Sequence, residues 1–173
     1  MSSDPWLAVT NGQALRFFYE RLRDVVPEGP ATSDDELLYN ASVLAHFATT
    51  STASVTDFPP SPVNLSTVFD VFVMDRSQHV DPEVMEAAGS QCLMLTGFFQ
   101  DQLRRRHNVE WYAGLGADFY DSAAHLSRDL ARVRLLGRMA AHFEFWRRQQ
   151  RRLAVELRDE PLLIHIRPED RPH

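Results

Sequence analysis

The sequence predicts an all-α fold, a single-domain helical bundle of five or six helices with a long C-terminal amphipathic helix. Apolar residues recur at three- and four-residue spacing along most of the chain, which is the period of an amphipathic helix. Residues that favour helix starts precede these segments, and proline or glycine follows several of them. With 173 residues, 44% of them hydrophobic, the chain is long enough to bury a core without disulfides.

Two helices are predicted in the first third of the chain. The first covers residues 11–26, with Asn11 as its N-cap and Pro27 directly after its end. Its apolar residues form one stripe with charged residues off it, as in a helix that packs on one face. The second opens at Ser33, which forms a capping-box pattern with Glu36 three residues later.

A linker separates these helices from the centre of the chain. Residues 49–63 are rich in Ser, Thr and Pro and lack helical periodicity, so we expect a mobile surface loop. The apolar run VFDVFVM after it fits a helix or a strand, and we favour a short helix because no partner strand is evident nearby. The triplet Asp81-Pro82-Glu83 then combines a cap, a first-turn proline and an acid. One central helix is expected from Glu83 to Arg106.

The C-terminal half is predicted to hold an aromatic segment and one long helix. The glycine pair in Gly114-Leu115-Gly116 would let another backbone approach closely. The last helix is expected over residues 127–158, and this length exceeds what a compact domain needs, so it would protrude, bend or pack on a second copy. Pro161 ends it. The helical domain is thus predicted over residues 1–160, with an extended or disordered tail over 161–173.

Cysteine content and hydropathy indicate in which cellular compartment the protein is expected. The one cysteine, Cys92, excludes an internal disulfide and fits a reducing compartment. It stands in the most apolar segment, which favours a packing residue over a nucleophile. No basic leader precedes an apolar run, and no apolar stretch approaches the roughly 20 residues of a membrane helix. We therefore expect a soluble cytoplasmic protein of bacterial type without a membrane partner.

Residues 89–121 contain a distinctive order of features. These are Gly97-Phe98-Phe99, Leu103 with Arg105-Arg106, the pair Trp111-Tyr112, and Gly116 with Tyr120 in a YxxxGxxxY pattern. In this order the segment resembles an uncharacterised group of bacterial helical proteins, and it departs from that group by having Trp at position 111 and Glu at position 110. The resemblance covers about a fifth of the chain. It implies a helical fold and a bacterial origin, and it brings no activity.

The familiar catalytic and cofactor signatures are absent from the sequence. It contains no phosphate-binding GxxxxGK[ST], no GxGxxG after a strand, and no CxxC, HExxH or GxSxG. The Glu-x-x-His pairs of a di-iron helical bundle are missing as well. The sequence therefore indicates no particular cofactor, and leaves open whether the protein is an enzyme.

One polar constellation could carry chemistry. Asp118, Asp121 and His125 share a face of a predicted helix, where they would bind a divalent metal or form a general base oriented by an acid. The alternative, which so common a spacing favours, is a solvent-facing polar stripe opposite Phe119 and Ala123.

A second candidate is the arginine-rich last helix. Residues 128–158 carry nine arginines against three acids, whereas residues 1–75 carry three arginines against ten acids. We predict an interaction surface formed by Arg147, Arg148, Arg151, Arg152 and Arg158. Arginine binds carboxylates and phosphates bidentately. Pairing with the acidic region, within the molecule or across a dimer, is favoured over nucleic-acid binding because the whole chain is acidic.

These observations favour a non-enzymatic bacterial interaction or regulatory protein, homodimeric or with another protein partner, that acts through helical contact surfaces. The first alternative is a small helical enzyme or a ligand- or metal-binding protein. Its pocket would be lined by four aromatic residues, Trp111, Tyr112, Phe119 and Tyr120. The second alternative is a nucleic-acid binder that uses the arginine-rich last helix.

Overall fold

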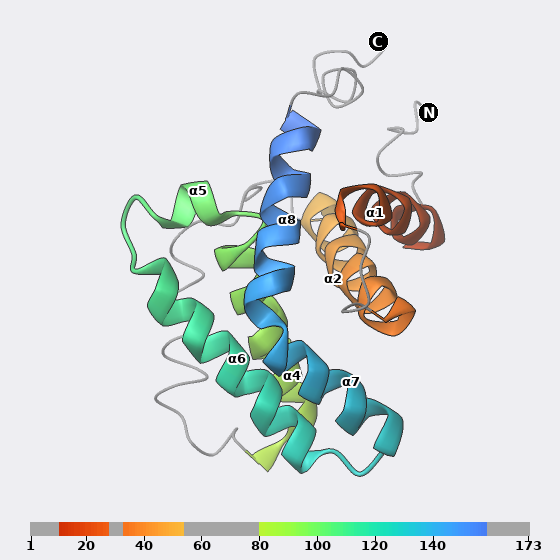
Figure 1. The fold of residues 1–173 in the computed structure, drawn as a ribbon, viewed down its shortest axis with the longest axis vertical. Coiled ribbons are helices and arrows are strands. Elements are labelled where there is room, and N and C mark those ends of the chain that lie inside the picture. Colours follow the sequence, from red (N-terminus) through yellow and green to blue (C-terminus); the bar gives the residue numbers. More distant parts are fainter. Residues whose placement is uncertain (1–10, 28–32, 54–79, 159–173) are drawn as a thin grey trace. The chain divides into compact units, whose positions relative to one another are not determined.

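The computed structural model describes residues 11–27, 33–53 and 80–158 (Figure 1). The regular elements in these ranges are all helices: α1 (Asn11–Val25), α2 (Asp34–Ala53), α4 (Pro82–Thr96), α5 (Gln100–Leu103), α6 (Val109–Leu126), α7 (Leu130–Ala141) and α8 (Phe143–Arg158). The predicted all-α fold class is therefore confirmed for the part of the chain that the structure describes. None of the helices in these ranges is long and apolar enough to cross a membrane.

The described helices fall into two compact units. The N-terminal unit contains α1, α2 and the end of α8 from Arg152 onward, and the central unit contains α4 to α7 and α8 up to Arg151. The single domain predicted over residues 1–160 stays a prediction. The predicted tail over 161–173 lies outside the described residues.

In the N-terminal unit, α1 and α2 pack against each other, and their ends follow local signals. The first helix ends before Pro27, as predicted. Ser33 Oγ accepts a hydrogen bond from the Glu36 amide at 3.3 Å, and the Glu36 carboxylate accepts one from the Ser33 amide at 3.4 Å. This confirms the capping box. The helix α2 extends to Ala53 and so includes the first residues of the predicted loop 49–63, whose remainder lies outside the described ranges.

In the central unit, α4 starts as predicted but ends early. The Asp81 carboxylate accepts a hydrogen bond from the Glu83 amide at 2.9 Å and caps the helix. The single helix expected from Glu83 to Arg106 is wrong beyond Thr96, because the chain turns at Gly97 before α5. A Cβ atom at Gly97 would lie 2.8 Å from the Leu93 carbonyl and 3.0 Å from that of Arg147, so the backbone of α8 passes too close for a side chain.

The single long helix predicted over residues 127–158 is also wrong. The structure has two helices there, α7 and α8, separated at His142. Asp129 caps the first by accepting a hydrogen bond from the Ala131 amide at 2.9 Å. Phe143 begins the second and is buried, with its ring 6.1 Å from that of Tyr120. The break between α7 and α8 therefore lies directly before Phe143, whose side chain is part of the core.

Small residues let the helices of the central unit pack closely. The helix α6 packs along both α4 and α7 (Figure 1). A Cβ atom at Gly89 of α4 would lie 3.0 Å from the Tyr120 ring. A Cβ atom at Gly116 of α6 would lie 2.7 Å from Cys92 Cβ and 2.5 Å from Phe143 Cζ. The close approach predicted for the Gly114–Gly116 segment is therefore confirmed at Gly116.

Candidate interaction surface

Three of the four aromatic residues predicted to line a ligand pocket are core residues. Tyr112, Phe119 and Tyr120 expose 9%, 4% and 0% of their surface. Tyr112 packs in a cluster with Leu95 and Leu103. These rings fill the interior of the central unit and thus hold α6 in place.

The predicted metal-binding residues Asp118, Asp121 and His125 lie on one face of α6, as the spacing required, and all three are exposed. The His125 ring nitrogen Nδ1 lies 2.8 Å from the Asp121 carbonyl oxygen and 3.7 Å from its carboxylate. Among the described residues, no group of three or more His, Cys, Asp or Glu side chains is arranged to hold a metal ion. The three side chains therefore lie on one face of α6, but they do not converge on a common metal-binding position.

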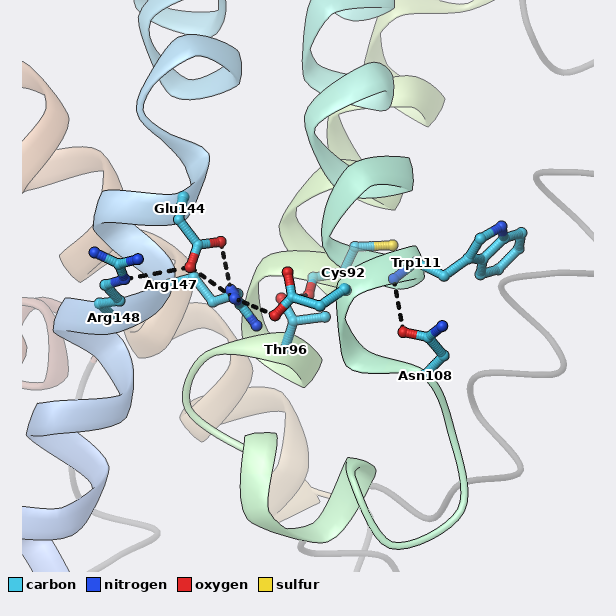
Figure 2. A network of polar contacts seen from close by, with 8 residues as sticks. Cys92, Thr96, Asn108, Trp111, Glu144, Arg147 and Arg148 are labelled. Atoms are coloured by element: carbon cyan, nitrogen blue, oxygen red, sulfur yellow. Dashed lines mark hydrogen bonds and ion pairs between the residues drawn. The ribbon is translucent and has the colours of Figure 1, made fainter.

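Arg147, predicted to be part of an exposed arginine surface, is buried at 5% exposure. Its Nε donates to Glu144 at 2.9 Å, and its Nη2 donates to Glu144 at 2.7 Å and to Glu110 at 2.9 Å (Figure 2). Burial lowers the pKa of Arg147, but the hydrogen bonds to the two carboxylates outweigh it, and the pKa is raised overall. Arg147 thus ties α8 to the start of α6 and is not part of an exposed surface.

The other four arginines of the predicted interaction surface differ in whether they pair with a carboxylate and in how exposed they are. Arg148 also pairs with Glu144, at 3.3 Å, and Arg151 pairs with Asp101 at 3.4 Å. Arg152 and Arg158 are exposed on the last turns of α8. The carboxylates that pair with Arg147, Arg148 and Arg151 come from residues 101–144, whereas the sequence favoured the acidic region before residue 76.

The outward face of α6 combines an exposed tryptophan, a glycine and the three residues predicted to bind a metal. We call it the α6 stripe; its exposed members, three or four residues apart, are Trp111, Gly114, Asp118, Asp121 and His125. Trp111 is 45% exposed, and its ring meets the Tyr112 ring edge-on at 4.8 Å. Figure 2 shows its indole pointing away from the Arg147 cluster. One turn further on, a Cβ atom at Gly114 would have no neighbour within 4 Å in the part of the chain that the structure describes.

The outward face of α7 is built in a similar way. The α7 stripe consists of Leu130, Arg134, Gly137 and Ala141, which lie on the side of the helix opposite the buried Met139. Leu130 is 71% exposed, and a Cβ atom at Gly137 would again have no neighbour within 4 Å among residues 11–27, 33–53 and 80–158. Sequence reasoning missed this stripe because it weighed the arginines of residues 127–158 alone. Gly137, a glycine on the polar face of the predicted helix, was the feature of the sequence that could have indicated it.

Cys92 is fully buried and is the packing residue that the sequence predicted. Desolvation by burial raises the pKa of its thiol from 9.0 to about 12. The thiolate is the nucleophilic form of cysteine, so Cys92 is a poor nucleophile at neutral pH.

A comparison with protein-family models, curated proteins and solved structures finds no match. The resemblance of residues 89–121 to a bacterial group therefore stays a prediction, and function has to be argued from the surfaces described above.

Proposed function

We propose that this protein is a non-enzymatic interaction protein of the bacterial cytoplasm, homodimeric, which acts through exposed helical faces. The observation that carries the proposal is the α6 stripe, where a half-exposed tryptophan stands one turn from an unfilled glycine. Tryptophan is enriched among the residues that dominate protein–protein binding. An edge contact with Tyr112 restricts its ring, so less side-chain freedom is lost when a partner binds.

The enzymatic alternative has less support from the same face. Enzymes gather their reactive groups in a cleft that excludes water, where electrostatic interactions are strong. The side chains of Asp121 and His125 are 62% and 77% exposed on an open helix surface. Cys92, the chain's one thiol, is buried in its neutral form. Binding another protein requires no such enclosure, so interaction fits these residues better.

Native mass spectrometry with a metal scan, on protein purified gently from its own source, tests the proposal. We expect a self-associated species that carries neither a stoichiometric metal nor a retained small molecule. Either of these would contradict the proposal and support the enzyme or ligand-binding alternative. The variant Asp118→Asn/Asp121→Asn would then show whether the retained species depends on the α6 carboxylates.

An electrophoretic mobility shift separates the proposal from the nucleic-acid alternative. Binding through arginine–phosphate contacts is strongest at low salt and weakens steeply as salt is added. We expect no shift of a random-sequence duplex or single strand even at low salt, because buried Arg147 and paired Arg151 are engaged with carboxylates. A salt-sensitive shift would contradict the proposal.

A further inference from the structure

We propose that the occupant of the α6 stripe is a second copy of this chain, which presents its α7 stripe. The inference rests on the proposed function and deepens it by naming the two contacting faces and the partner. Both stripes belong to the central unit, so one copy carries both halves of the contact.

The first argument concerns the two outward glycines. Glycine weakens a helix relative to alanine, so its presence within one calls for a reason. Gly89, Gly97 and Gly116 have that reason inside the molecule, since a Cβ atom at each would lie within 3.0 Å of a neighbouring atom. For Gly114 and Gly137, no other described residue lies within 4 Å of such an atom. A bare helix surface at these two points allows another helix to approach closely.

The second argument concerns shape. Each stripe places a large exposed apolar side chain near its start, Trp111 on α6 and Leu130 on α7, with exposures of 45% and 71%. Each also has an unfilled glycine further along the same face. The projections of one stripe can therefore seat beside the bare backbone of the other, which is how packed helices interdigitate.

The third argument is charge complementarity. The α6 stripe carries the carboxylates of Asp118 and Asp121, and the α7 stripe carries Arg134, with exposed Arg128 just before the helix. Arginine and carboxylate form strong, often bidentate pairs. A guanidinium can also stack on the exposed Trp111 ring. Two α6 stripes would repel each other, as would two α7 stripes, so the charges select contact between unlike stripes.

In a two-fold dimer of this kind, the contact forms twice. The α6 stripe of each copy meets the α7 stripe of the other, as the symmetry of an isologous interface requires. Reversing the charge of one stripe therefore damages both contacts at once. Reversing each stripe in a different chain, and mixing the two chains, restores both.

Charge-swap variants test the inference by sedimentation velocity over a wide range of protein concentrations. We expect the wild type to dimerise. Asp118→Arg/Asp121→Arg (α6 reversed) and Arg128→Glu/Arg134→Glu (α7 reversed) should each raise the dimer Kd by more than about a hundredfold, since like charges across an interface are strongly unfavourable. An equimolar mixture of the two variants should recover a dimer that contains one chain of each.

The control is Arg105→Glu/Arg106→Glu, which changes exposed arginines outside both stripes and should leave the dimer Kd unchanged. Far-UV circular dichroism checks that each variant is folded, and recovery in the mixture shows it independently. A monomeric wild type overturns the inference, as does a dimer that both reversals leave intact or a mixture without recovery. A monomeric wild type would also contradict the homodimer in the proposed function. A dimer that both reversals leave intact, or a mixture without recovery, overturns only the pairing of the two stripes and leaves the metal and ligand content unchanged, so the two proposals can fail separately.

Discussion

The two faces of α6 use glycine in opposite ways. At Gly116 a Cβ atom would lie 2.5 Å from Phe143 Cζ and 2.7 Å from Cys92 Cβ, so the fold itself excludes a side chain. At Gly114, two residues earlier, no described residue outside the helix's own backbone lies within 4 Å of the corresponding position. The inward glycine is explained by the packing of one chain. The outward glycine has no such explanation among the described residues, and we propose that it serves contact with a second copy of the chain.

The largest expected effect concerns the inward face and its buried thiol. Cys92 is fully buried, so a thiol reagent should react with it only when the central unit opens. With an ordinary folding stability, we expect the native protein to react roughly a thousandfold or more slowly than the protein in denaturant. A disulfide reagent that releases thionitrobenzoate on reaction with a thiol is suitable, because the rise in absorbance measures the rate. Fast labelling under native conditions would show that the inward face is open.

The next effect comes from filling the inward glycine. Gly116→Ala places a methyl group against Cys92 Cβ, which cannot move without shifting α4. Overpacking of this kind lowers the free energy of unfolding by about 1–3 kcal/mol. Urea denaturation measures it. Gly89→Ala is the milder comparison, because the nearest Tyr120 ring atom is 3.0 Å from the new methyl position. An equal loss at both sites would contradict the packing described for Gly116.

A third effect concerns the buried cation beside this packed face. Glu144→Gln replaces one of the two oxygens that accept hydrogen bonds from Arg147 by an NH2 group and removes the negative charge, whereas Glu110→Gln can keep its one accepting oxygen and loses only the charge. Since Arg147 is buried, we expect Glu144→Gln to cost about 1–3 kcal/mol of stability and Glu110→Gln clearly less. Thermal and urea unfolding of both variants provide the comparison. A larger loss of stability for Glu110→Gln than for Glu144→Gln would mean that Glu110, which is 77% exposed, is the more important partner of Arg147.

The smallest effect, of opposite sign, belongs to the outward glycine. Gly114→Ala meets no neighbour within the described structure and replaces glycine within a helix, so it should stabilise the monomer by about 0.5–1 kcal/mol. Urea unfolding at concentrations where the wild type is monomeric isolates this change from dimerisation. A loss of stability would mean that Gly114 is needed inside the chain.

The starts of α2 and α4 could be predicted from the sequence because capping is local. Ser33 with Glu36 and Asp81 with Glu83 make the expected hydrogen bonds within a few residues of chain. At Gly97 the chain turns where the backbone of α8 comes within 3.0 Å of a Cβ position, and residue spacing carries no information on such a contact. The break at His142 was not predicted from residue spacing either.

The candidate interaction surface could likewise be predicted only in part. Periodicity placed Asp118, Asp121 and His125 on a common face, but it did not decide between a metal site and a solvated stripe. Arg147 has the sequence appearance of a surface residue, and only its contact with Glu110, 37 residues away, shows that it is buried and paired.

The most direct test of the account is the self-association of Gly114→Leu, measured by sedimentation equilibrium. Ala87→Leu is its matched control, because it adds a similar side chain at an exposed position of α4 outside both stripes. We predict that the Gly114→Leu monomer is at least as stable as the wild-type monomer, while its dimer Kd rises by more than about tenfold and that of the control does not. A Gly114→Leu protein that dimerises as tightly as the wild type would contradict the claim that the outward face of α6 is a contact surface.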